Sequence, residues 1–395
     1  MSIAEVEYKL VATTFHGLED VLAKELLRLG AREIEVHKRS VSFTGDKGFI
    51  YKTNFCLRTA LRVLRPLVTF TINSPEELHA QAKLVEWSNY FNVDQSFAVD
   101  VVMNSELFAN SMFPALKIKD GIVDYFREKT TKRPDVNKED PDIYIYAHIF
   151  KDRCTISLDT SGEPLFKRGY RQDVEAAPMS EVLAAGLVML SGWERHQPFV
   201  DFMCGSGTIL IEAALIAADI PPGIFRKKYA FQSWPDYDET LFETISESAL
   251  ARIRENDGYI YGCDRMERAV EKAKLNITAA NVDDMIKVKT ADFRDFVPPI
   301  GRGVVIINPP YGERLQVDEL SQFYESIGDH IKKNYQGYTV WIISPWSGAP
   351  KNIGLHASKK ITLYNGPLEC RFMRYDIYDG SKKAKYQKSS DESSE

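Results

Sequence analysis

Asp201–Thr208 (DFMCGSGT) and Asn308–Tyr311 (NPPY) are the two stretches that decide the fold of this chain. The first follows an apolar run, Pro198–Val200, and precedes Ile209–Leu215, whose apolar spacing is typical of a helix. The order of strand, glycine-rich turn and helix predicts an open α/β sheet, in which ligands bind beyond the carboxyl ends of the strands. The candidate ligand contacts of this turn are Asp201, Cys204, Gly205 and Gly207.

Acidic residues follow the next two predicted strands. The run 259–263 leads into Asp264, whose carboxylate suits the two hydroxyls of a ribose. The run 286–290 is followed by Asp292, which could accept a hydrogen bond from an exocyclic adenine amine. Asp264 alone is also explained by helix capping, and a Gly-x-Gly turn alone also fits a nicotinamide-type Rossmann loop. A fourth strand, 303–307, runs into Asn308, so all four motifs are predicted at strand ends.

The two prolines after the fourth strand have no explanation in backbone propensity, because they remove two donors and stiffen the loop. Methylation of an exocyclic amine on a planar base requires the nitrogen lone pair to turn toward the methyl donor. The Asn308 side-chain oxygen and the Pro309 carbonyl would accept both N–H bonds, and the Tyr311 ring would stack on a flipped base. These three residues are the catalytic candidates, and no strong general base is needed.

Together with Phe15–Glu19 (FHGLE), Asn308–Arg314 (NPPYGER) and Asn365–Cys370 (NGPLEC), these motifs resemble the THUMP-domain S-adenosylmethionine-dependent RNA methyltransferases. The sequence is most similar to the N-terminal half of the bacterial 23S rRNA guanine-N2 methyltransferases, over nearly the whole chain. The chain stops where that longer, two-enzyme version continues, so we do not expect the second activity here.

The resemblance implies S-adenosyl-L-methionine as the cofactor and 23S rRNA, or a large-subunit precursor, as the partner. It implies that Asp201, Gly205 and Gly207 form the cofactor loop, that Asp264 binds the ribose and Asp292 the adenine. The implied catalytic loop is Asn308, Pro309 and Tyr311. The expected activity is methyl transfer to N2 of a guanine in 23S rRNA.

Other functions remain open. Related THUMP enzymes modify a guanine in tRNA, and Asn-Pro-Pro-Tyr also serves enzymes that methylate adenine N6 or a protein glutamine amide. A catalytically silent RNA-binding assembly factor would keep the same fold. The THUMP-like region favours RNA over protein, and the intact cofactor loop with Asn308 favours an enzyme.

The expected fold class is α/β, a doubly wound Rossmann-like methyltransferase sheet with an antiparallel terminal hairpin, preceded by two α+β domains. We expect a ferredoxin-like domain in residues 1–65, a THUMP domain in 66–160 and the methyltransferase domain in 161–380. The hairpin is predicted to turn at Asn365-Gly366. Residues 381–395, poor in apolar side chains, are predicted to be disordered.

Several cationic segments are candidate RNA contacts. Arg58, Arg62 and Arg65 would share one face of a helix predicted over 49–64, where a solvated surface is the main interpretation and a phosphate contact the alternative. A basic run in a second predicted helix, 115–132, favours phosphate contacts in the context of a THUMP domain. Its cations, with one just beyond the helix, are Lys117, Lys119, Arg127, Lys129, Lys132 and Arg133.

Two further segments have two interpretations each. An insertion, 219–240, alternates cations with aromatic residues such as Trp234 and Tyr237. These rings either pin the insertion to the sheet or, as we hypothesise, border the substrate entrance and contact unpaired bases. The linker 162–177 either packs beside the cofactor, which is favoured, or touches RNA, and Glu181 after it is a candidate ligand.

Composition limits the remaining choices. The net charge of −6 means that an RNA footprint must be a local patch rather than a property of the whole chain. Five scattered cysteines without a C-x-x-C pair predict a reducing compartment and no structural metal site. The N-terminus has no apolar signal run, and no stretch is apolar enough to span a membrane, so we expect a cytoplasmic protein that is not bound to a membrane. The oligomeric state is left open.

Overall fold

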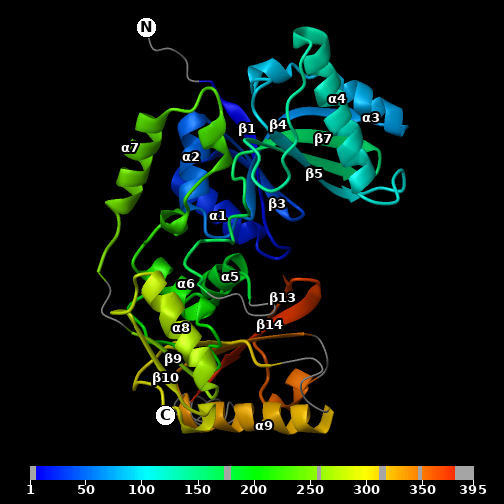
Figure 1. Cartoon of the computed structure of the whole chain (residues 1–395). Helices are drawn as coiled ribbons and strands as arrows, with labels where there is room; N and C mark the ends of the chain where they lie inside the picture. Colours follow the sequence, from blue (N-terminus) through cyan, green and yellow to red (C-terminus); the bar gives the residue numbers. More distant parts are fainter. Residues whose placement is uncertain (1–5, 173–178, 256–258, 311–316, 346–348, 379–395) are drawn as a thin grey trace, which may run out of the picture. The chain divides into compact units, whose positions relative to one another are not determined.

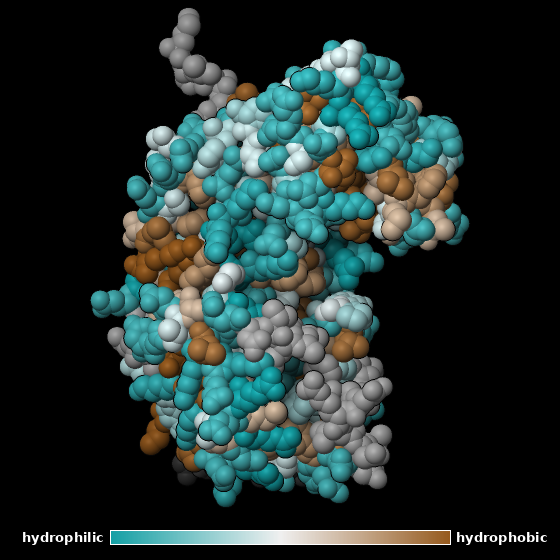
Figure 2. All heavy atoms as spheres, in the orientation of Figure 1, coloured by the Kyte–Doolittle hydropathy of each residue, from teal (hydrophilic) through white to brown (hydrophobic). Residues whose placement is uncertain are grey.

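The computed structural model describes residues 6–172, 179–255, 259–310, 317–345 and 349–378. The chain divides into two compact units, each with a seven-stranded sheet (Figure 1). The first unit comprises residues 1–14, 22–167 and 221–251, and the second comprises 15–21, 168–220 and 252–395. Figure 2 shows mainly hydrophilic side chains on the surface it displays.

The first unit contains one continuous sheet with the strand order β2-β3-β1-β4-β7-β6-β5. Its strands are β1 (Tyr8–Thr13), β2 (Arg32–His37), β3 (Ser40–Gly45), β4 (Arg62–Thr71), β5 (Phe97–Asn104), β6 (Ile143–Phe150) and β7 (Arg153–Asp159). Its longer helices are α1 (Glu19–Leu29, whose first turn groups with the second unit), α2 (Lys47–Cys56), α3 (Pro75–Lys83), α4 (Met112–Thr130) and α7 (Glu239–Leu250). Alternate residues such as Leu10 and Ala12 of β1 are fully buried, as expected for a sheet with helices packed on one face.

The predicted helix over 49–64 is wrong in its second half. Helix α2 ends at Cys56, and the residues from Arg62 onward form strand β4, which pairs with β1 on one side and β7 on the other. The cause is long-range packing: Val63 pairs with Ala12 of β1 and is fully buried, as expected for a residue in a central strand of the sheet. Arg58, Arg62 and Arg65 therefore do not share a helix face.

Each of these arginines has a structural contact within the first unit. Arg62 forms an ion pair with the buried carboxylate of Asp159. The Arg65 guanidinium lies 4.0 Å from the centroid of the Tyr8 ring. Arg58 is itself buried, which removes it as an exposed phosphate contact.

The predicted domain boundary at residue 66 lies inside β4. The strand continues through Pro66 with a register shift between Pro66 and Val68, and it then pairs with β7 as far as Thr71. A single sheet therefore spans the ferredoxin-like and THUMP-like segments.

The second unit has the strand order β10-β9-β8-β11-β12-β14-β13. Its strands are β8 (Phe199–Asp201), β9 (Ile260–Asp264), β10 (Ile286–Thr290), β11 (Val304–Ile307), β12 (Thr339–Pro345), β13 (Lys359–Asn365) and β14 (Leu368–Asp376). Its longer helices are α5 (Glu181–Ser191), α6 (Thr208–Ala217), α8 (Glu267–Ala279) and α9 (Val317–Asn334). The five strands from β10 to β12 in this order are parallel, and β14 and β13 close the sheet as an antiparallel hairpin, which confirms the expected fold class.

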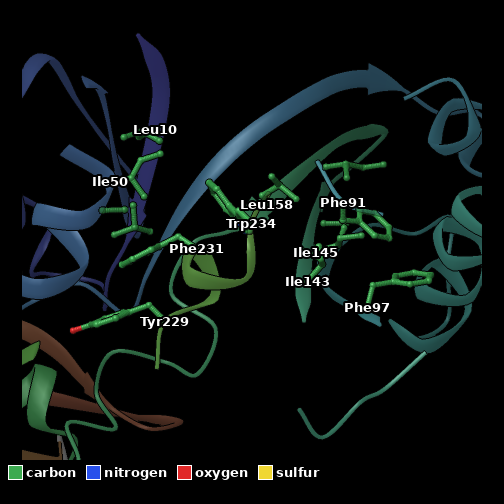
Figure 3. Close-up of a cluster of buried hydrophobic side chains, with 14 of the residues drawn as sticks. Leu10, Ile50, Phe91, Phe97, Ile143, Ile145, Leu158, Tyr229, Phe231 and Trp234 are labelled. Carbon is green, nitrogen blue, oxygen red and sulfur yellow. The ribbon is translucent and has the colours of Figure 1, made fainter. Parts of the chain in front are cut away.

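The insertion 219–240 follows α6 in sequence, but its residues from Pro221 onward belong to the first unit. Tyr229, Phe231 and Trp234 are buried in the core of that unit, and Figure 3 shows Phe231 and Trp234 between Leu10 and Ile50 on one side and Leu158 and Ile145 on the other. The Phe231 ring lies 4.5 Å from that of Tyr51 on α2. The hypothesis that these rings contact unpaired bases is therefore wrong, because they are packed against protein.

Two further predictions concern the C-terminal tail and membrane-spanning segments. The predicted tail, 381–395, lies outside the described residues. Among the helices that the structure describes, none combines the length and apolarity that a bilayer crossing requires.

Candidate active site

Four adjacent parallel strands bring the predicted motifs to one edge of the second sheet. β8 ends at Asp201 and β9 ends at Asp264, while Asn308 directly follows β11 and Asp292 is the second residue after β10. The order β10-β9-β8-β11 makes these strands neighbours, so their carboxyl ends share an edge. In doubly wound sheets this edge is where ligands bind.

The glycine-rich turn between β8 and α6 needs its glycines for two different reasons. Gly205 and Gly207 have φ values of 53° and 83°, in the region that favours glycine. A Cβ on Gly207 would lie 3.2 Å from the Cβ of Ala273 on α8, so this glycine allows close packing of turn and helix. A Cβ on Gly205 would meet nothing within 4 Å, so this glycine instead leaves open space beside the backbone.

Backbone hydrogen bonds fix the turn to the end of β9. The Gly205 amide donates to Oδ2 of Asp264 over 3.0 Å, and the Cys204 amide donates to the Cys263 carbonyl over 3.1 Å. Oδ1 of Asp264 accepts a second bond, from the Met266 amide, over 2.9 Å. A carboxylate has about four acceptor positions, so Asp264 keeps capacity for two hydroxyl donors.

Asp201 and Cys204 lie in a dry part of the turn. Asp201 is 1% exposed, and burial raises the pKa of its carboxyl to about 8. A hydrogen bond from the Met203 amide acts in the other direction and lowers this pKa, but the effect of burial is larger. Burial also raises the pKa of the Cys204 thiol well above its usual value. A buried, protonated thiol is a poor nucleophile, so Cys204 has the properties of a packing residue whose backbone borders the site.

Asp292 is partly exposed, as Asp264 is, and differs from the other two carboxylates because it is paired with an arginine. Both of its oxygens accept hydrogen bonds from the Arg294 guanidinium over 2.8 Å, and Oδ1 also accepts from the Arg294 amide. These bonds lower the pKa of Asp292 to about 2, so the carboxylate is ionised at neutral pH. An adenine amine that donates to Asp292 would have to share this carboxylate with Arg294.

The loop after β11 contains a buried polar atom to which none of the described residues donates a hydrogen bond. All four residues of β11 are buried, and Pro309 behind them is buried as well. Oδ1 of Asn308 is also buried, and no residue in the described part of the chain donates a hydrogen bond to it. Such an oxygen is costly to leave unsatisfied, which makes it a candidate acceptor for a hydrogen bond from a ligand. The third catalytic candidate, Tyr311, lies outside the described residues.

Residues 168–172 of the predicted linker pack inside the second unit, whereas 162–167 belong to the first unit and 173–177 lie outside the described residues. Packing of this linker beside the cofactor stays a prediction. Arg168 is buried and pairs with the fully buried Glu212 of α6. Arg171 donates to Glu181 over 3.0 Å and to Oγ1 of Thr208, the first residue of α6, over 3.3 Å. Glu181 thus holds an arginine next to the glycine-rich turn, and its role as a ligand stays a prediction.

Asn276 on α8 is a site residue that the sequence did not reveal. Its Nδ2 donates to the carbonyl of Ser206 in the glycine-rich turn over 3.1 Å, and its Oδ1 accepts from the Gln172 amide over 3.1 Å. The side chain is 3% exposed, so both bonds are protected from water. The signal that could have revealed Asn276 is an amide side chain at a position of the α8 sequence that packs toward the core.

Comparison with known families divides the chain into three parts. A ferredoxin-like domain of the RlmL type matches residues 9–64, and a THUMP domain matches 73–159. The RMKL-like methyltransferase domain matches residues 168–374, which is more than half of the chain.

Individual proteins are similar over almost the full length. A provisionally named RNA methyltransferase of Synechocystis sp. is 36% identical and is covered to 96% of its length by 93% of this chain. The ribosomal RNA large subunit methyltransferase K/L of Syntrophotalea carbinolica is 38% identical over 93% of this chain. The chain spans 53% of that protein, about half of its length.

Solved structures give the same picture. The provisionally named methyltransferase SMU.472, in complex with S-adenosylhomocysteine (SAH), has a TM-score of 0.85 at 32% identity, with 95% of this chain and 99% of that chain covered. A provisionally named methylase from Clostridium difficile 630 has a TM-score of 0.86 at 32% identity, with 95% and 100% covered.

Proposed function

The chain belongs to the RMKL-like methyltransferase family, and from this premise we propose that it transfers a methyl group from S-adenosylmethionine to N2 of a guanine in 23S rRNA. The RNA methyltransferase part of this proposal is supported by the names of the similar proteins and by the THUMP match. The guanine N2 and the 23S rRNA rest on the likeness to the K/L proteins and on the chemistry of the Asn308 loop.

The residues at the strand ends fit the proposed cofactor. The open space beside Gly205 would admit the cofactor against the backbone, and the remaining acceptor capacity of Asp264 suits the ribose hydroxyls. Asp292, ionised and partly exposed, would accept from the adenine amine. When bound, S-adenosylmethionine supplies an electrophilic methyl group attached to sulfur.

The buried Oδ1 of Asn308, which has no hydrogen-bond donor among the described residues, is the observation that carries the proposed chemistry. An exocyclic amine has two N–H donors, and Oδ1 of Asn308 together with the Pro309 carbonyl would accept both. Holding the amine in this way turns its lone pair out of the ring and toward the donor. Catalysis would then come mainly from positioning, which contributes up to roughly 7 to 11 kcal/mol in favourable cases.

The test is methyl transfer from labelled S-adenosylmethionine to unmodified large-subunit rRNA and, separately, to unmodified tRNA, followed by nucleoside analysis. We expect N2-methylguanosine in the large rRNA alone. Label in tRNA or in N6-methyladenosine would keep the methyltransferase and reject the proposed substrate. No label in any RNA would reject the RNA methyltransferase and favour a protein substrate or a silent binder.

Two substitutions separate catalysis from cofactor binding. Asn308→Ala should lower the rate of methyl transfer about a hundred- to a thousandfold, as the loss of a preorganised polar group does, and leave cofactor affinity unchanged. Gly205→Ala should instead lower cofactor affinity, because its methyl group enters the open space beside the turn.

Gly192→Ala is the matched control for Gly205→Ala, because Gly192 also has a positive φ, of 73°, and no atom within 4 Å of a built Cβ. Both substitutions should cost about 1 to 2 kcal/mol of unfolding free energy through backbone strain. Only Gly205→Ala should weaken the binding of S-adenosylmethionine in calorimetry.

An Asn308→Ala variant that transfers methyl groups at the wild-type rate would contradict the proposed role of the amide.

A further inference from the structure

Strand β6 presents aromatic side chains on the face of the first sheet that faces away from helices α3 and α4. The other face is formed by Ile143, Ile145, Ala147 and Ile149, which are buried in one cluster with Ile118 and Ile122 of α4. Because side chains alternate along a strand, the intervening residues lie on the opposite face. This set, named here the β6 row, is Tyr144, Tyr146, His148 and Phe150.

The β6 row is accessible and lies between two strands that extend the same surface. Phe150 is 52% exposed and His148 is exposed, while the two tyrosines are partly buried. In the register, His148 lies opposite Val102 of β5, which is 50% exposed. Phe150 lies opposite Arg153 of β7. The surface around His148 and Phe150 is therefore exposed and partly apolar.

Two cations that form no ion pair with a described carboxylate lie beside Phe150. The ammonium of Lys151 is 5.7 Å from the Phe150 ring centroid. Within the described residues, neither Lys151 nor Arg153 forms an ion pair with a carboxylate. At the other end of the row carboxylates outnumber the cation, because Arg62 pairs with Asp159 and lies 3.9 Å from a second carboxylate, that of Asp100. Phosphate contacts are therefore expected at the Phe150 end.

Helix α4, whose basic run the sequence suggested as an RNA contact, shows the opposite situation. Four of its basic-run cations are paired with acidic side chains, so much of its positive charge is neutralised within the protein. The pairs are Lys119 with Asp120, Arg127 with Asp124, Lys129 with Glu86 and Lys132 with Asp94. Among the described residues, the sheet face thus offers exposed rings beside cations that have no ion pair, whereas most cations of the basic run are already ion-paired.

Taking the proposed RNA methyltransferase activity as its basis, we propose that the β6 row binds a single-stranded segment of the substrate RNA. Rings on every second residue of a strand are spaced at roughly 7 Å, so the two exposed rings, His148 and Phe150, can each receive one unstacked base. Lys151 and Arg153 would contact the phosphates beside Phe150. Base stacking tolerates any sequence, so this face would grip the RNA and leave the choice of nucleotide to the methyltransferase site.

The experiment compares Phe150→Ala with Phe113→Ala in the full chain. Phe113 on α4 is the matched control, because it is 45% exposed and also has a lysine beside it. The ammonium of Lys117 lies 5.4 Å from the centroid of the Phe113 ring. Binding of a short labelled RNA strand of mixed sequence, and of the same strand annealed to its complement, is measured by fluorescence anisotropy. We expect Phe150→Ala to weaken single-strand binding about five- to hundredfold, the range for loss of one stacked base, and Phe113→Ala to leave it unchanged.

A second variant tests the charges. Arg153→Gln should reduce the slope of log affinity against log salt concentration by about one, as expected for one lost phosphate contact. Unchanged single-strand affinity in Phe150→Ala, or a larger loss in Phe113→Ala, would overturn the proposal. Because binding is measured without methyl transfer, failure of the proposed activity would appear separately, as absent label with the affinity difference intact.

Discussion

Asp201 carries one charge-related property that a sequence motif cannot specify. Its position at the end of β8 buries the carboxyl completely and raises its pKa to about 8, whereas an unfolded aspartate titrates near pKa ~4. The folded protein therefore holds a proton between about pH 4 and pH 8 that the unfolded chain releases. Stability from this group is present at low pH and is lost as the pH rises through that window.

Asp201→Asn removes the titration and keeps the size of the side chain. We expect the unfolding free energy of the wild type to fall relative to the variant by up to about 1.4 kcal/mol per pH unit across the window, and to level off above about pH 8. Urea unfolding of both proteins at several pH values measures this difference. A difference that does not change with pH would mean that Asp201 is ionised throughout.

At the scale of elements, the glycine-rich turn depends on helix α8 as well as on the strands beside it. Asn276 links the Ser206 carbonyl of the turn to the Gln172 amide of the linker, so one side chain holds two segments that are distant in sequence. Its contribution is to position the turn, because the amide contacts only protein backbone.

Asn276→Asp keeps the acceptor for Gln172 and replaces the donor to Ser206 with an oxygen. Loss of a buried hydrogen bond costs about 1 to 3 kcal/mol, so we expect the KM for S-adenosylmethionine to rise about tenfold, with kcat at saturating cofactor nearly unchanged. Leu275→Ala, at a neighbouring position that is 59% exposed, is the control and should behave as wild type. An unchanged KM in Asn276→Asp would remove Asn276 from the site.

At the scale of the whole molecule, the chain leaves and re-enters each unit. The segment 221–251 lies inside the range matched by the methyltransferase family, and it completes the core of the first unit. Its Phe231 is fully buried against Tyr51, Tyr229 and Phe242. The stability of the first unit therefore depends on residues that follow the glycine-rich turn in the sequence.

Phe231→Ala should destabilise the first unit by about 3 to 5 kcal/mol, the usual cost of truncating a buried aromatic ring. Hydrogen exchange read by mass spectrometry should show faster exchange in α2 peptides and unchanged exchange in β8 and β9. Tyr335→Ala, which truncates a fully buried ring of the second unit, should give the reverse pattern. Faster exchange confined to β8 and β9 in Phe231→Ala would contradict this division of the chain.

The sequence alone determined the methyltransferase sheet and the position of its candidate site. Strand ends, the glycines at positive φ and the double proline are local features, because each depends on the backbone preferences of a few neighbouring residues. Asp201, Asp264, Asp292 and Asn308 consequently lie at the edge where they were predicted, although their roles remain predictions.

Only the tertiary structure decided which of the cationic and aromatic segments face water. The pattern of the insertion 219–240 fits either a core or a base-binding surface, and long-range contacts with α2 buried its rings. Arg62 lies in a strand, because β4 must fill the sheet between β1 and β7. The open face with the β6 row likewise follows from the packing of α4 on the other side of the sheet. Local patterns cannot specify such outcomes, because the partners that settle them lie far away in the sequence.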